Sequence, residues 1–132
     1  MMSFDAFEEA VREEIELLPD YVKEELNGGV LVDESAYLHP GAVSDDLYIL
    51  GTYSNHYIYG KQIVLYYGSF VRTLHGAPEE VIRTQIRNTL RHEFLHHMET
   101  RAGLFGSGTL IEEDAKRMMT YYMRHGKLPK DQ

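Results

Sequence analysis

Hydrophobic side chains near the start of the chain recur every three or four residues, with glutamates between them. This is the pattern of an amphipathic helix, and Ser3 or Asp5 is available as its N-cap. Pro19 interrupts the pattern, and residues 20–26 are expected to add a further helical turn or two. The apolar positions of the first helix are Phe4, Phe7, Val11, Ile15 and Leu18.

The middle of the chain is rich in residues that favour β-strands. Residues 30–32 predict a short strand, and the segment 36–46 has the Pro, Gly and Asp content of a loop. Residues 47–53 and 62–67 are full of Tyr, Ile, Val and Leu, which predicts two neighbouring strands with a connection of several residues. Residues 68–76 carry no clear pattern.

A long helical pattern follows. Pro78 suits the first position of a helix, and two glutamates come next, where negative charge complements the helix dipole. Apolar residues then continue without a breaker to Gly103, which predicts a helix of about 24 residues. Residues 110–124 predict a last helix with Thr109 as its cap. The order α, β, β, β, α, α predicts one α+β domain over residues 1–132.

Bulk composition narrows the functional classes. A chain of 132 residues with 43% hydrophobic and 26% charged residues is an ordinary globular domain. A formal net charge of −8 argues against nucleic acid and anionic membranes as partners. The chain has no signal-like start and no apolar stretch near 18 residues, so we expect a cytoplasmic protein. With no cysteine, any metal must be held by nitrogen and oxygen atoms.

The sequence His92-Glu93-Phe94-Leu95-His96 has the pattern H-E-x-x-H and lies within the predicted long helix. Four residues advance an α-helix by about 400°, so both imidazoles project from one face, one turn apart. They can close on a single metal ion, while Glu93 lies beside them as a general base. The pattern predicts a zinc-dependent hydrolase.

A catalytic zinc ion needs a third protein ligand and an open position for water. Glu99 falls within about 20° of His92 on a helical wheel and completes a stripe with the two histidines. Alternatively, the ligand returns from the start of the last helix, where Glu112, Glu113 and Asp114 follow one another. Glu99 is favoured only slightly, because three ligands along one straight helix do not easily surround a tetrahedral ion.

The sequence also suggests positions for the other histidines and a role for some tyrosines. His97 points away from the stripe and is expected to be a supporting or surface residue. Solvent-facing positions are expected for His39, His56, His75 and His125. Candidates for stabilising a developing oxyanion are the tyrosine pairs Tyr66-Tyr67 and Tyr121-Tyr122.

The predicted chemistry is hydrolysis of a peptide bond in a peptide or small protein. Zinc would lower the pKa of bound water from about 15.7 to about 7, and Glu93 would accept the proton during attack on the carbonyl. Nickel, iron or manganese could use the same ligands. The competing hypothesis is a non-catalytic metal-binding or peptide-binding module. The sequence gives no indication of oligomeric state.

A resemblance to a known family extends over residues 3–103, and the segments that carry it are 7–11, 17–19, Leu26, 50–53, 63–66 and 92–97. On these segments the chain resembles the small bacterial zincin-like metallopeptidase family. The resemblance implies a minimal zincin fold: a small mixed β-sheet packed against helices, with the H-E-x-x-H helix under an edge strand. It also implies a zinc peptidase.

The chain departs from this family just after the pentad. Relatives tend to continue it as H-E-x-x-H-x-x-G-x-x-D, in which the glycine turns the chain and the aspartate is the third ligand. Here those two positions are Glu99 and Ala102. The resemblance therefore leaves the third ligand to Glu99 or to a later acid.

Overall fold

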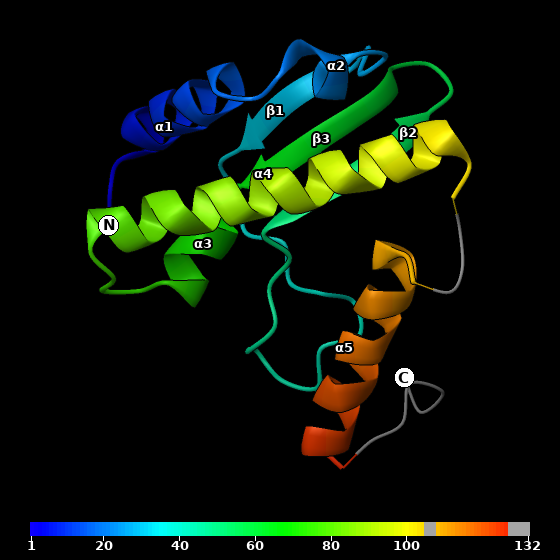
Figure 1. Ribbon diagram of the computed structural model, residues 1–132. Coiled ribbons are helices and arrows are strands. Elements are labelled where there is room, and N and C mark those ends of the chain that lie inside the picture. The colour runs from blue at the N-terminus through cyan, green and yellow to red at the C-terminus, as the bar shows by residue number, and fades with distance from the viewer. Residues whose placement is uncertain (105–107, 127–132) are drawn as a thin grey trace.

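The computed structural model describes residues 1–104 and 108–126. In this part of the chain, helices flank a central group of strands (Figure 1). The elements in chain order are α1 Phe4–Glu16, α2 Asp20–Lys23, β1 Gly29–Asp33, β2 Gly51–His56, β3 Gly60–Tyr66, α3 Tyr67–Thr73, α4 Glu79–Ala102 and α5 Leu110–Arg124.

The strands form one mixed sheet in the order β1-β3-β2. β3 lies in the centre, parallel to β1 and antiparallel to β2, and Val64 is paired with Leu31 on one side and Thr52 on the other. β2 is therefore an edge strand. The α+β prediction is confirmed, with a small mixed sheet and helices packed on it.

The hydrophobic core lies between the sheet and two helices. Ile63 and Leu65 of β3 are fully buried and point toward α4, while Val64 between them is only partly buried. This alternation follows from the two-residue period of a strand. Burying one such side chain contributes about 1.5–3 kcal/mol. Val22 of α2 and Phe70 of α3 also belong to the core, and its residues on α1 and α4 are Phe7, Ala10, Val11, Ile82, Ile86, Leu90 and Phe94.

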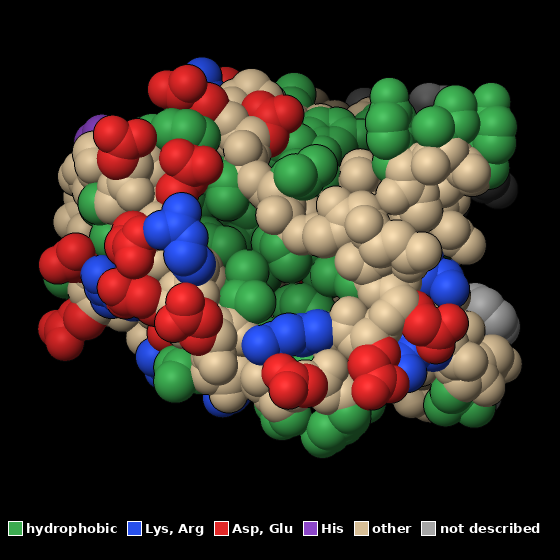
Figure 2. Space-filling model, turned by 90° about the horizontal axis from the view of Figure 1, so that it is seen from above, with side chains coloured by type: hydrophobic (Ala, Val, Ile, Leu, Met, Phe, Trp, Pro, Cys, Tyr) green, Lys and Arg blue, Asp and Glu red, His purple; other side chains and the backbone are tan. Residues whose placement is uncertain are grey.

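Charged side chains fasten α1 beside α4. Arg87 Nε donates to Glu14 Oε1 at 2.8 Å, and Arg83 Nη1 to Glu13 Oε2 at 3.1 Å. Seen from above, acidic and basic side chains gather on the side of the molecule where α1 lies (Figure 2). These ion pairs link the two helices beside the apolar contacts that bury their facing sides.

The two helices that carry candidate ligands begin and end close to where the sequence indicated. α4 has 24 residues, follows Pro78 directly and ends at Gly103, whose φ of 69° is the left-handed conformation that glycine adopts easily. The side chain of Thr109 accepts a hydrogen bond from the main-chain N–H of Glu112, which confirms it as the cap of α5.

Three predicted elements need correction. The second helix ends at Lys23 rather than near residue 26, and α3 occupies residues that carried no clear pattern. The strand expected from residue 47 begins only at Gly51, because residues 47–49 pair with the preceding loop instead. Main-chain bonds from His39 to Leu47 and from Ile49 to Tyr37 hold them there.

α5 packs against the loop between β1 and β2 (Figure 1). Tyr121 Oη donates to Asp46 Oδ1 at 2.8 Å and accepts from the main-chain N–H of Val43 at 2.9 Å. His125 Nε2 lies 3.0 Å from Asp46 Oδ2. The C-terminal half of α5 is thus held by the loop.

Among the described residues, no helix is both long and apolar enough to cross a membrane.

Candidate metal centre

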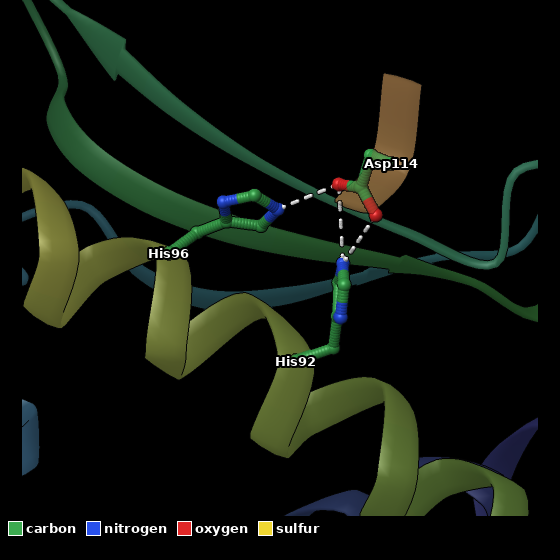
Figure 3. A group of neighbouring side chains, drawn as sticks. All are labelled: His92, His96 and Asp114. Atoms are coloured by element: carbon green, nitrogen blue, oxygen red, sulfur yellow. Dashed lines mark hydrogen bonds and ion pairs between the residues drawn. The ribbon is translucent and has the colours of Figure 1, made fainter. Parts of the chain in front are cut away.

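His92 and His96 project from the same side of α4, one turn apart, as the pentad predicted. Their ring centroids are 4.8 Å apart and the rings are almost perpendicular, at 88°. Both side chains are mostly shielded from solvent, with 25% and 16% exposed. This arrangement brings both Nε2 atoms to one point above the helix (Figure 3).

Asp114 of α5 meets the two imidazoles at that point (Figure 3). His96 Nε2 lies 2.9 Å from Asp114 Oδ2, and His92 Nε2 lies 3.3 Å from the same carboxylate. Arg117 Nη1 also donates to Asp114 Oδ1, at 3.2 Å. Within the described residues, one ligand atom each from His92, His96 and Asp114 lies within 4.8 Å of the other two.

This donor set fits a small divalent cation. Nitrogen and oxygen ligands about 2.0–2.2 Å from a tetrahedral ion lie about 3.3–3.6 Å from one another. The separations of 2.9 and 3.3 Å between Asp114 and the imidazoles therefore need only small adjustments. Two imidazoles and one carboxylate are typical of catalytic zinc sites, and they also suit other first-row metals.

The structure does not bring Glu99, the slightly preferred third ligand, into this group. Its carboxylate turns toward the start of α5, where Oε2 and Oε1 lie 3.2 and 3.3 Å from the main-chain nitrogen of Leu110. Glu112 accepts from the main-chain N–H of Gly108 and pairs with Lys116, and Glu113 is exposed. Of the candidate acids, the structure places Asp114 with the two histidines.

Glu93 lies beneath this group and is almost completely buried, with 6% exposed. Burial, and secondly the charge of Asp114, raise the pKa of the Glu93 carboxyl from 4.5 to about 7. A carboxyl group with such a pKa can both accept and release a proton near neutral pH, as a general acid–base must.

The edge strand β2 crosses α4 directly beside Glu93. A Cβ atom on Gly51 would lie 2.8 Å from Thr89 Cγ2 and 3.5 Å from Glu93 Cγ. The absence of a side chain at Gly51 thus lets the strand approach the helix closely at the pentad.

A cavity of about 860 Å³ opens between β2, α4, α5 and the loop before β2. It is large enough for several residues of a peptide chain. The edge of β2 forms one wall, and the candidate metal centre lies in another. Lining residues that bear on the chemistry are His39, Thr52, His92, Glu93, His96 and Asp114.

His39 was expected to face solvent, but the structure places it in the cavity wall. Its Nδ1 accepts the main-chain N–H of Gly41 at 2.9 Å, and burial lowers the pKa of the imidazole. The neutral ring therefore carries its proton on Nε2, as a donor. The sequence offered only a weak indication that His39 lies in the cavity wall, namely its position before Pro40 and Gly41 in an expected turn.

The tyrosine candidates are used elsewhere. Tyr67 donates to the main-chain oxygen of Met2, and Tyr121 is bonded to the β1–β2 loop. Tyr66 packs against Tyr37. In the described structure, neither these three nor Tyr122 lines the cavity.

His97 is fully buried, so the expectation of a supporting role describes it better than a surface role. Its Nδ1 lies 2.7 Å from Tyr53 Oη, and its Nε2 lies 2.7 Å from the main-chain oxygen of Glu24. The doubled histidine thus has two different environments: His96 faces the cavity, and His97 joins α4 to β2 and to the segment after α2.

The fold and site define a class: an α+β protein with an H-E-x-x-H helix and a two-histidine, one-carboxylate group. No family model and no curated protein matches the chain. Among solved structures, it is similar to a conserved hypothetical protein from Thermus thermophilus, with a TM-score of 0.66 and 30% identity. The match covers 76% of this chain and 98% of the other. The chain belongs to the same family as that protein.

Proposed function

We propose that the protein is a zinc-dependent metallopeptidase of the minimal zincin type, acting on a peptide or small protein. The observation that carries this proposal is the convergence of His92, His96 and Asp114 beside the buried Glu93, in the wall of a peptide-sized cavity. A zinc ion held by these three residues would supply a Lewis acid and make water acidic enough to lose a proton near neutral pH.

The remaining chemistry belongs to the chain itself. Glu93 takes the proton released by the attacking water and delivers it to the leaving amine, a role suited to its raised pKa of about 7. His39 offers Nε2–H to the carbonyl oxygen of the substrate, where negative charge develops. Proton transfer and charge stabilisation are thus assigned to two different residues of the cavity wall.

The number of candidate ligands favours a catalytic site over the competing non-catalytic module. A structural zinc site is closed by four protein ligands, whereas a catalytic site keeps one position open. In the described part of the chain, the group comprises three residues. The donor set alone suits several first-row metals. Zinc is proposed over nickel, iron and manganese because the two histidines and the glutamate come from an H-E-x-x-H helix, the pattern of zinc metallopeptidases, and metal analysis tests this directly.

The test combines metal content with hydrolysis of a quenched fluorescent peptide library. The wild type is expected to hold about one equivalent of zinc and to cleave members of the library. Glu93→Gln should retain zinc and lose hydrolysis, and Asp114→Ala should lose both. Glu113→Gln is the matched control, since it removes an exposed carboxylate beside Asp114.

Two results would contradict the proposal in different ways. Failure of the wild type to bind zinc after reconstitution would remove the metal centre itself. Bound zinc with hydrolysis that survives in Glu93→Gln would show that the activity does not come from this site.

A further inference from the structure

Glu99 takes part in both ends of the connection between α4 and α5. Its main-chain oxygen accepts the N–H of Leu104 at 2.9 Å, in the turn that ends α4 at Gly103. Its carboxylate then accepts the N–H of Leu110, the first residue of α5, at 3.2 Å. One residue therefore contacts both the end of the first helix and the start of the second.

The two helices meet in two successive contacts. On α4, Glu99 lies three residues after His96; on α5, Asp114 lies four residues after Leu110. Glu99 with Leu110 forms one contact, and His96 with Asp114 forms the next, about one helical turn further along α5. A displacement of Leu110 relative to Glu99 therefore also displaces Asp114 relative to His96.

We propose that Glu99 is a positioning residue for the metal centre: it anchors the first turn of α5 so that the Asp114 carboxylate reaches both imidazoles. The inference rests on the proposed function. A carboxylate is well suited to this task, because it accepts strongly from a helix N-terminal N–H and favours the positive end of the helix dipole. The anchor of α5 through Tyr121 lies two turns beyond Asp114, whereas Glu99 contacts the first turn of the helix, next to its cap Thr109.

Glutamine separates this role from that of a ligand. Glu99→Gln keeps a side-chain oxygen of the same reach that can accept from Leu110, but it is a poor replacement for a metal-binding carboxylate. Glu99→Ala removes the acceptor altogether. If Glu99 is an anchor, Glu99→Ala should lose Zn²⁺ affinity and Glu99→Gln should keep it. If Glu99 is a ligand, both variants should lose Zn²⁺ affinity.

The experiment measures Zn²⁺ affinity of the full chain by chelator competition, for the wild type, Glu99→Ala, Glu99→Gln and the control Glu113→Ala. Residues that orient a ligand typically change metal affinity 10–100-fold. We expect Glu99→Ala to bind Zn²⁺ at least about 10-fold more weakly, and Glu99→Gln and Glu113→Ala to stay within about threefold of the wild type. Cobalt-substituted Glu99→Gln should keep the wild-type absorption spectrum, because the ligands are unchanged.

A second measurement needs no metal. Amide hydrogen exchange at Leu110 in the metal-free protein should be faster in Glu99→Ala than in Glu99→Gln or the wild type. The proposal would be overturned if Glu99→Ala bound Zn²⁺ as tightly as the wild type and showed the same rate of amide exchange at Leu110. A Glu99→Gln variant that loses zinc as Glu99→Ala does, with an altered cobalt spectrum, would also overturn it. If the wild type binds no zinc, the proposed function fails, and exchange at Leu110 alone supports or overturns the anchor.

Discussion

Replacing Glu93 with glutamine is expected to change how the stability of the metal-free protein depends on pH. In the folded protein, burial raises the pKa of Glu93 from 4.5 to about 7. Between these two values the folded state holds a proton that the unfolded state has lost. The contribution of Glu93 to the free energy of unfolding therefore falls as pH rises through this window, and this contribution changes no further above about pH 7.

The magnitude follows from the two pKa values. Each pH unit across which only the folded state holds the proton costs about 1.4 kcal/mol, so the interval from 4.5 to about 7 amounts to about 3 kcal/mol. Typical domains have 5–15 kcal/mol of stability in all, so this is a measurable share. Glutamine does not ionise, and whatever its buried amide costs is the same at every pH.

The assay is urea denaturation of metal-free wild type and Glu93→Gln from pH 4.5 to pH 8. The variant should gain about 3 kcal/mol relative to the wild type between pH 4.5 and pH 7, with a constant difference above that. Glu113→Gln, which removes an exposed carboxylate, should follow the wild type. Parallel stability curves for the wild type and Glu93→Gln would refute the assignment of a raised pKa to this buried carboxyl.

Three further predictions concern the elements around the site. Gly51→Ala should destabilise the fold by about 1–3 kcal/mol through its contact with Thr89, as measured by urea denaturation, and Thr89→Ser in the same chain should recover part of the loss. Tyr121→Phe should cost about 0.5–3 kcal/mol in the same assay, because Asp46 loses one of its hydrogen-bond donors and the main-chain N–H of Val43 loses its acceptor. His39→Ala should lower kcat of the proposed hydrolysis about 100-fold while zinc content stays at the wild-type level; an unchanged kcat would remove His39 from the chemistry.

The elements that sequence patterns predicted well are those with strong boundary residues. α4 was predicted because Pro78 and Gly103 bracket an uninterrupted apolar period, and α5 because Thr109 caps it. α3 carried no such pattern. It forms where tertiary packing holds it, since a Cβ on Gly68 would lie 2.5 Å from the main-chain nitrogen of Ala36, and Phe70 is fully buried.

The site was predictable as far as local helix geometry extends. His92, Glu93 and His96 belong to one helix, so their arrangement follows from its period alone. His39 comes from a loop whose path depends on pairing with residues 47–49 and on Tyr121, some 80 residues away. Contacts between segments so distant in the chain leave no periodic signal in either one.

The third candidate ligand is an intermediate case, because the last helix does contain a signal that distinguishes its three acids. On α5, Ile111, Asp114 and Met118 follow one another at steps of three and four residues, and all three line the cavity. Asp114 is thus the acid within the stripe of α5 that lines the cavity, between two apolar residues. Glu112 and Glu113 are turned about 200° and 100° away from it. Once Thr109 fixes the start of the helix, a carboxylate in register with Ile111 and Met118 favours Asp114 as the partner of the two histidines, and the contact of Glu99 with Leu110 brings that stripe to α4.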